Sequence, residues 1–432
     1  MKDLHQMAFL AREAFYRIAD SSSDTRNKIL FSLSDLLRKH QQEIYDANAA
    51  DTEEAKKSDL ALPLLHRLFF GAEKLNQVIL SLQSLAELPD PLNRTLFANE
   101  ITDGLDLYRV TAPIGVIGVI FESRPDALIQ ISSLCIKSGN AVLLKGGREA
   151  FRTNSILCEL VRKALSENGI SSDTVQLLET REDVAGMLKE DKLIDLIIPR
   201  GSNAFVKYIM DNSNIPVLGH ADGICHVYID SSADPDMAVR IAVDSKTQNV
   251  SVCNAMETLL VHKDIAPLIL SLLEKAFMAE HVEIRGDENA MKYMDCVPAE
   301  EKDWSTEYLD YILSVKVVSS LDEAISHINH YGSHHTDCIV TSDPENASLF
   351  MRRVDSAGVY WNVSTRFADG FVYGLGAEVG ISTGKIHARG PMGLEGLTTY
   401  KYKLLGKGHT MQEMKNGTRA YTHRTLNDSC PV

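Results

Sequence analysis

The sequence predicts an α/β protein with two mostly parallel sheets. From residue 112 onward, short apolar runs of strand length alternate with segments of helical periodicity. The runs are apolar throughout instead of alternating with polar residues, which is typical of parallel strands covered by helices on both faces. The chain has 432 residues, enough for more than one packed unit.

The elements follow one another in a clear order. Residues 3 to about 87 have a helical pattern rich in Leu, Ala, Glu and Lys, and residues 106–111 alternate like an exposed strand. A first α/β stretch follows, with strands expected at 115–120, 141–144, 174–178, 193–198 and 224–229. A second stretch extends from about 236 to 380, with strands expected at 257–262, 314–318, 337–341 and 358–361. The polar tail after Gly406 fits either disorder or a segment that wraps a partner subunit.

Composition excludes several classes of protein. The net charge of −15 makes nucleic acid and anionic membranes poor partners. The longest apolar run, 114–121, is too short to span a bilayer, and the first twenty residues form an amphipathic helix instead of a secretory signal. The seven cysteines are an odd number without a C-x-x-C pair, which disfavours a disulfide framework and a zinc site. We therefore expect a cytoplasmic protein without a metal.

One cysteine, Cys253, has the setting of a nucleophile. Asp234 and Pro235 are an N-cap and a first-turn proline for a helix before it, and strand 257–262 follows it. A loop at such a junction can display a thiol without burying it, although an arbitrary cysteine is more often a small buried hydrophobe. Asn254 follows directly, so its amide and the local backbone N–H groups could face an oxygen held beside the sulfur.

Three loops follow expected strands of the first sheet, where ligands of parallel sheets collect. The first loop, directly after the strand at 115–120, contains Arg124. In the second, Lys145 ends a buried strand before two glycines, a setting suited to a phosphate or a ribose hydroxyl. The third contains Gly201 and Ser202 at a helix N-terminus, where free N–H groups favour an anion.

Two basic segments near the end of the chain could form a carboxylate or phosphate pocket. They contain Arg366, Lys385 and Arg389, although exposed loop charges often have no such role. The dinucleotide fingerprint G-x-G-x-x-G is absent after the strand at 115–120, which argues against a standard Rossmann dehydrogenase.

Taken together, these motifs resemble the gamma-glutamyl phosphate reductase family of the aldehyde dehydrogenase superfamily. The segments that carry the resemblance are 112–125, 144–149, 198–202, 252–258 and 387–399, and the similarity extends from about residue 5 to residue 410. The resemblance implies an aldehyde dehydrogenase-like fold with a cofactor domain, a catalytic domain and a small oligomerisation element. The expected cofactor domain covers residues 1–105 and 112–234, and the expected catalytic domain covers 235–380. The expected oligomerisation element covers 106–111 and 395–432.

The resemblance also implies NADPH as the hydride donor, a homo-oligomer and a set of site residues. Lys145, Gly201, Ser202 and Glu307 would bind the cofactor. Cys253 and Asn254 would be catalytic. The expected substrate-binding cations are Arg124, Arg366, Lys385 and Arg389.

The implied reaction is the second step of proline biosynthesis. A Cys253 thiolate would attack the acyl phosphate, release phosphate and form a thioester that is then reduced to glutamate-5-semialdehyde. Hydrolytic relatives carry a Glu-Leu-Gly-Gly base segment, and the corresponding segment 217–220 lacks the glutamate, so phosphate is a more natural partner than water. A further departure from the family is the approach to the thiol, 248–251.

Two alternatives remain open at this point. One is an acylating aldehyde dehydrogenase that uses coenzyme A or phosphate with a different acyl chain, for which a cation that binds a substrate carboxylate would be unnecessary. The other is an inactive relative that serves as a subunit in a complex with glutamate kinase. The labile acyl phosphate makes that kinase a plausible partner of the active enzyme as well.

Overall fold

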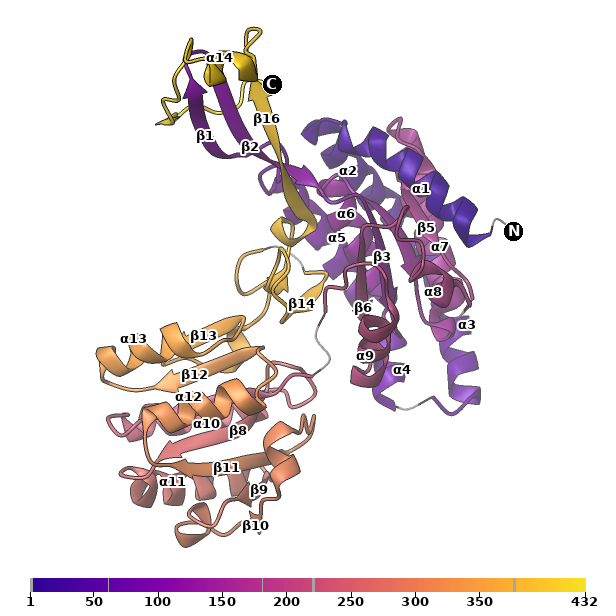
Figure 1. Ribbon diagram of the computed structural model, residues 1–432. Coiled ribbons are helices and arrows are strands. Elements are labelled where there is room, and N and C mark those ends of the chain that lie inside the picture. The colour runs from indigo at the N-terminus through magenta and orange to yellow at the C-terminus, as the bar shows by residue number, and fades with distance from the viewer. Residues whose placement is uncertain (1–2, 61, 181, 220–221, 376–377) are drawn as a thin grey trace.

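The protein consists of two α/β lobes and a projecting antiparallel arm (Figure 1). The computed structural model describes residues 3–60, 62–180, 182–219, 222–375 and 378–432. In Figure 1 the first lobe lies at the right, the second at the lower left and the arm at the top. This architecture confirms the predicted fold class. None of the described helices combines the length and apolarity needed to cross a membrane.

The first lobe is a four-stranded parallel sheet with the order β5-β4-β3-β6. Every residue of its central strand β3 is buried, because one core packs α2, α5, α6 and α7 on one face and a second core packs α1, α8 and α9 on the other. The elements are α1 (Leu4–Ala19), α2 (Ser23–Lys39), α3 (Gln41–Lys57), α4 (Leu62–Leu68), α5 (Ala72–Glu87), β3 (Val116–Phe121), α6 (Pro125–Lys137), β4 (Ala141–Lys145), α7 (Phe151–Glu167), β5 (Val175–Leu177), α8 (Glu182–Met187), β6 (Leu196–Arg200) and α9 (Asn203–Asn212).

The second lobe is a seven-stranded parallel sheet with the order β10-β9-β11-β8-β7-β12-β13. Its helix α10 begins as predicted, since the Asp234 carboxylate accepts a hydrogen bond from the N–H of Met237 at 2.8 Å. The elements are β7 (Cys225–Ile229), α10 (Pro235–Thr247), β8 (Met256–His262), α11 (Ala266–Ala279), β9 (Glu283–Gly286), β10 (Val297–Pro298), β11 (Ile312–Val318), α12 (Leu321–Tyr331), β12 (Thr336–Val340), α13 (Pro344–Arg353) and β13 (Gly358–Trp361).

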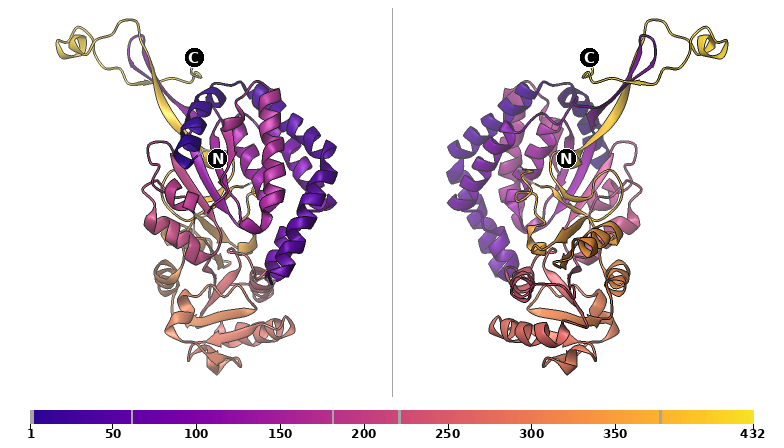
Figure 2. Two further views of the ribbon diagram at one scale, coloured as in Figure 1. Left: turned by 90° about the vertical axis from the view of Figure 1, so that its right-hand side faces the viewer. Right: turned by 90° about the vertical axis from the view of Figure 1, so that its left-hand side faces the viewer.

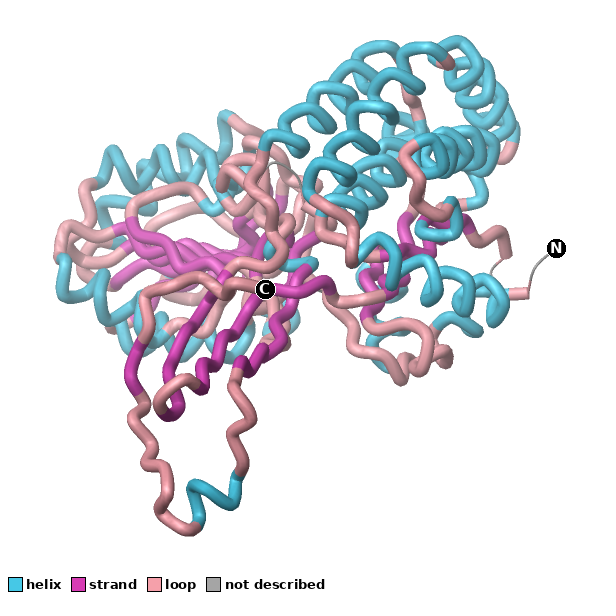
Figure 3. Tube along the Cα trace, turned by 90° about the horizontal axis from the view of Figure 1, so that it is seen from above, coloured by secondary structure: helices cyan, strands magenta, loops and turns pink. Residues whose placement is uncertain are grey.

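The arm joins segments from far apart in the sequence. Its strands are β1 (Thr95–Thr102), β2 (Leu105–Pro113), β16 (Thr398–Leu405) and β17 (Arg424–Thr425), and β16 pairs with β2 from Thr398↔Pro113 to Leu405↔Asp106. The arm projects away from both lobes (Figure 2), and the short helix α14 (Met411–Lys415) lies near its tip (Figure 3). The polar tail therefore folds back on the arm. A small antiparallel pair of strands, β14 (Gly380–Ser382) and β15 (Gly390–Met392), precedes β16 in the chain.

The structure moves two expected boundaries. Residues 225–229 were expected in the first sheet, but β7 pairs with β8 and β12 in the second, so the second lobe begins well before residue 235. The arm also takes β1, which the sequence analysis left in the cofactor domain. A fully apolar strand fits either buried sheet equally well, so its pattern does not indicate which sheet it joins.

Candidate active site

The thiol of Cys253 lies in the turn between α10 and β8, at the predicted helix-to-strand junction. Its side chain is partly buried, and the backbone of Gly223 presses against it. A Cβ added to Gly223 would lie 2.3 Å from the Cys253 carbonyl oxygen, so only glycine fits there. The Cys225 thiol donates to the same carbonyl oxygen at 3.3 Å. These contacts fix the backbone that carries the nucleophile candidate.

The charges around Cys253 have both signs. The pKa of the thiol is raised to about 12: burial is the largest cause, the carboxylates of Glu307 and Glu378 also raise it, and its own backbone N–H and Arg200 lower it. The resting thiol is therefore protonated at neutral pH. Ionisation becomes easier when positive charge near the sulfur increases or when negative charge is neutralised.

Asn254 holds a neighbouring loop against the thiol segment. Its buried side-chain amide donates to the Ala368 carbonyl oxygen at 2.9 Å. The backbone carbonyl of Asn254 accepts from the Thr365 hydroxyl at 2.7 Å. One hydrogen of the amide is thus used to position the loop. The oxyanion-donor role expected for this residue stays a prediction, together with the Cys253 backbone N–H.

The expected cofactor residues of the first lobe share the carboxyl edge of its sheet. Ile120 at the end of β3 pairs with Lys145 of β4, and Phe121 pairs with Arg200 of β6. The Lys145 ammonium donates to the Gly146 carbonyl oxygen at 2.6 Å. Gly201 and Ser202 follow β6, and the Ser202 N-cap side chain accepts no capping hydrogen bond from α9.

Glu307 reaches this edge from the second lobe. The Asn203 amide, directly after Ser202, donates to a Glu307 carboxylate oxygen at 2.5 Å and to Asp222 at 2.9 Å. Burial raises the pKa of Glu307, whose charge in turn acts on Cys253. The contact therefore joins the expected cofactor edge of the first lobe to a residue of the second lobe whose charge acts on the thiol.

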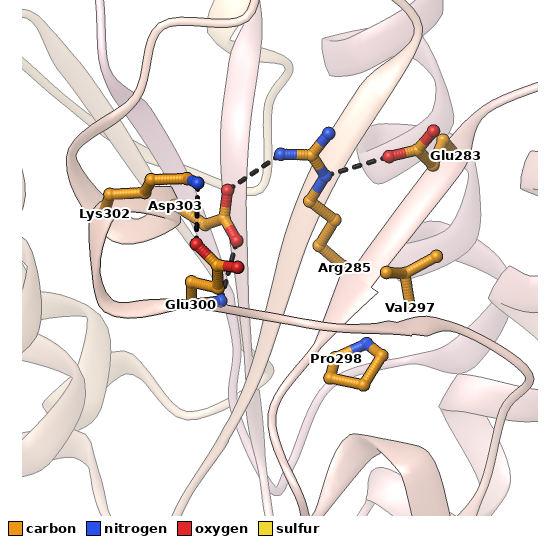
Figure 4. Close-up of a pocket in the computed structure, with 7 residues that line it drawn as sticks. All are labelled: Glu283, Arg285, Val297, Pro298, Glu300, Lys302 and Asp303. Carbon is orange, nitrogen blue, oxygen red and sulfur yellow. Dashed lines mark hydrogen bonds and ion pairs between the residues drawn. The ribbon is translucent and has the colours of Figure 1, made fainter.

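A network behind Glu307 braces its segment. Arg285 donates to Glu283 and to Asp303, each at 2.9 Å, as Figure 4 shows, and Tyr308 donates to the same Asp303 at 3.0 Å. The Tyr308 hydroxyl also lies 2.7 Å from the Ser314 hydroxyl of β11. Tyr308 directly follows Glu307, so these bonds restrain the position of that carboxylate.

A buried ion pair lies under the same segment. The Lys246 ammonium donates to Glu257 at 2.5 Å with both side chains fully buried, and the second Glu257 oxygen accepts from the Leu309 N–H at 3.3 Å. Burial disfavours the charged form of each group, so it raises the pKa of the Glu257 carboxyl and lowers the pKa of the Lys246 ammonium. The pair ties α10 and β8 to the loop that carries Glu307.

Two of the four expected substrate-binding cations lie near the site. Arg366 donates through Nε to the Gln248 amide oxygen at 2.9 Å, and Cys253 is among the groups whose charge acts on it. This contact also gives a role to Gln248 in the unusual segment 248–251. Arg124 lies at the end of the β3 loop, where its charge acts on Arg200 and Glu378.

The other two expected cations, Lys385 and Arg389, are paired with a carboxylate of the protein, and their substrate-binding role stays a prediction. Lys385 lies 2.5 Å from one oxygen of Asp355, and Arg389 donates at 2.9 Å to the other. The pair holds the pKa of Asp355 below its usual range. Asp355 therefore supplies the carboxylate that both cations bind. No local pattern in the sequence indicates that Asp355 lies beside them.

Sequence reasoning missed three residues of this site, Arg200, Glu378 and Asn203. Arg200 precedes the Gly201–Ser202 turn at a predicted strand end, so its position could have been noticed. Glu378, whose carboxylate accepts from the Gly370 N–H at 2.9 Å, and Asn203 had no local signal. His220, in the segment that replaces the hydrolytic base, lies outside the described residues.

Comparisons with known proteins agree with this geometry. The model of the aldehyde dehydrogenase family matches residues 1–291. The chain is 57% identical to a gamma-glutamyl phosphate reductase of Acetivibrio thermocellus, covering 99% of this chain and 100% of that protein. A crystal structure of gamma-glutamyl phosphate reductase from Thermotoga maritima superposes with a TM-score of 0.93 at 38% identity, covering 95% of this chain and 100% of that one. An acetylating aldehyde dehydrogenase of Geobacillus thermoglucosidasius shares the fold, with a TM-score of 0.64 at 17% identity, covering 94% and 97%.

Proposed function

Because the chain belongs to the aldehyde dehydrogenase family, and within it to the gamma-glutamyl phosphate reductases, we propose that it reduces gamma-glutamyl phosphate to glutamate-5-semialdehyde with NADPH, through a thioester on Cys253. The contact between Asn203 and Glu307 is the observation that carries the proposal, because it joins the expected cofactor edge to a carboxylate whose charge acts on the thiol. The reaction is the second step of proline biosynthesis.

The residues at the joined edge fit a nicotinamide cofactor. Gly201 allows close backbone approach, and the N-terminal N–H groups of α9 suit the pyrophosphate. Lys145 is at the right edge for the adenosine side, and Glu307 for the nicotinamide ribose. When bound, NADPH supplies the hydride that reduces the acyl group; the choice of NADPH rests on the family.

The acyl transfer follows from the thiol. The Cys253 thiolate attacks the acyl carbon, a C–S bond forms, and the C–O bond to phosphorus breaks as phosphate leaves with the electron pair. The Cys253 backbone N–H and the Asn254 region stabilise the developing oxyanion. After reduction the semialdehyde leaves and the thiolate is restored.

The position of Arg366 favours a substrate with its own carboxylate over a simple acyl chain. A guanidinium whose charge acts on Cys253 suits the α-carboxylate of a glutamyl group, whereas an alkyl chain needs no cation. Retention of the thiol, the braced Glu307 and this cation also argues against an inactive subunit.

The arm supplies the surface for a homo-oligomer. Its strands expose large apolar side chains, namely Phe97 at 42%, Tyr400 at 51%, Tyr402 at 58% and Leu404 at 57%. Exposed apolar surface on a strand edge favours association. The lability of the acyl phosphate supports a glutamate kinase as a partner. The need to keep Cys253 as a thiol supports a location in the reducing cytoplasm.

The test is NADP+ reduction with glutamate-5-semialdehyde, with and without phosphate, in the wild type and Cys253→Ala. We expect phosphate-dependent turnover in the wild type, and without phosphate a single burst of one NADPH per site with a thioester mass on Cys253. The variant should show neither. Turnover without phosphate would indicate a hydrolytic enzyme, and retained turnover in Cys253→Ala would contradict the assignment of the nucleophile.

A further inference from the structure

Two arginines meet at the end of neighbouring strands of the first sheet. Arg200 ends β6, beside Phe121 of β3, and Arg124 follows β3 three residues later. Burial lowers the pKa of Arg200, and the positive charge of Arg124 lowers it further. The strand register therefore places both arginines at the same edge of the sheet, and their charges act on each other.

Neither guanidinium has a partner within the part of the chain that the structure describes. No hydrogen bond or ion pair joins the guanidinium group of Arg124 or of Arg200 to any described side chain or carbonyl. The nearest carboxylates, Glu378 and Asp126, act on Arg200 only through their charge. Glu378 accepts from the Gly370 N–H, and Asp126 lies 3.7 Å from the Lys74 ammonium.

Two adjacent cations without a counter-ion are costly unless an anion joins them. Planar guanidinium groups match the oxygens of a phosphoryl group, and a pair of them suits a dianion better than a carboxylate. The charge of Cys253 acts on Arg200, so such an anion would lie beside the thiol.

The second lobe offers a different cation to the same thiol. Arg366 is single, is held by Gln248, and belongs to the loop bonded to Asn254. Neither Arg124 nor Arg200 is among the charges that act most strongly on it. The thiol thus has a two-arginine site from the first lobe and a one-arginine site from the second.

We propose that Arg124 and Arg200 bind the phosphoryl group of the acyl phosphate while Arg366 binds the α-carboxylate, so that the acyl carbon is held at Cys253 between the two sites. This inference rests on the proposed function and assigns the two ends of its substrate. In the oxidative direction the same pair holds inorganic phosphate. A phosphate oxygen then attacks the thioester carbon, the C–O bond forms, the C–S bond breaks, and the electron pair leaves on sulfur.

The cofactor pyrophosphate is the other source of phosphoryl oxygens near this edge, because Gly201 directly follows Arg200. The two sources differ in a measurable way. Arginines that bind the substrate phosphate set the KM for phosphate, whereas arginines that bind the pyrophosphate set the Kd for NADP+.

The experiment measures the KM for phosphate, the KM for glutamate-5-semialdehyde and the Kd for NADP+ in Arg200→Met, Arg124→Met and Arg366→Met. Arg352→Met, an exposed arginine on α13, is the matched control. For Arg200→Met and Arg124→Met we expect the KM for phosphate to rise about ten- to a hundredfold, the scale of lost hydrogen bonds to a charged group, with the Kd for NADP+ unchanged. Arg366→Met should raise the KM for the semialdehyde and leave that for phosphate within about twofold.

A weakened NADP+ affinity with an unchanged KM for phosphate would overturn the assignment and give the pair to the cofactor. An unchanged KM for phosphate in both Arg200→Met and Arg124→Met would also overturn it. Arg124 is exposed, so Arg124→Met keeps the test valid if Arg200→Met fails to fold. The burst of NADPH without phosphate should persist in both variants. Its loss in the wild type would instead count against the proposed function.

Discussion

Two groups of cations in this protein are similar in sequence and opposite in structure. Lys385 and Arg389 lie in a glycine-bearing basic segment and share Asp355, whereas Arg124 and Arg200 lie at neighbouring strand ends, where their charges act on each other. The first group has its counter-charge within the fold. The second lacks one among the described residues and lies beside the thiol. The difference indicates that a substrate-binding cation is recognised by the lack of a counter-charge among the described residues.

The buried pair of Lys246 and Glu257 gives the largest expected effect of a paired cation. Lys246→Met leaves a fully buried carboxylate without its partner, which should lower the free energy of unfolding by about 3–5 kcal/mol. Chemical denaturation measures this directly. The double variant Lys246→Met/Glu257→Met removes both charges and should recover most of the loss. A single variant as stable as the wild type would show that this pairing does not support the fold.

The partly exposed group around Asp355 should give a smaller loss. Asp355→Asn removes the charge shared by Lys385 and Arg389, and because this carboxylate is 41% exposed, solvent screens the pairs. We expect a decrease of about 1 kcal/mol in the free energy of unfolding, measured by urea denaturation. Asp35→Asn, which removes an exposed i,i+3 pair with Arg38, is the control and should change stability less. A larger loss in the control would contradict the ranking.

The smallest effect concerns the thiol itself. The pKa of Cys253 is raised to about 12, chiefly by burial, and the negative charge of Glu378 contributes to this rise. Glu378→Gln removes that charge while its amide oxygen can still accept from the Gly370 N–H, so the thiol pKa should fall by less than about one unit. Because more thiolate is then present below the pKa, iodoacetamide should label Cys253 a fewfold faster at pH 8. Slower labelling would contradict the sign of this interaction.

The sequence predicted the parts of the site that depend on local pattern. The junction at Cys253, the N-cap at Asp234 and the strand end at Lys145 follow from periodicity and turn residues. The resemblance supplied Glu307, and the structure places it against Asn203, about a hundred residues away in the sequence.

What sequence reasoning could not provide is the pairing of charges. Arg366, Lys385 and Arg389 look alike as basic residues in glycine-bearing loops. Only the fold shows that Asp355 takes two of them and that Arg366 stays at the thiol. The same holds for Glu378, whose chain neighbours give no indication that its charge acts on Cys253.

The most direct test of the contrast measures two quantities, the KM for phosphate and the melting temperature, in Arg200→Met and Asp355→Asn side by side. We expect Arg200→Met to raise the KM for phosphate at least about tenfold without lowering the melting temperature, because it removes a cation that has no counter-ion among the described residues, and Asp355→Asn to lower the melting temperature with an unchanged KM. The reverse pattern, a melting temperature that falls in Arg200→Met while phosphate binds as in the wild type, would contradict the account.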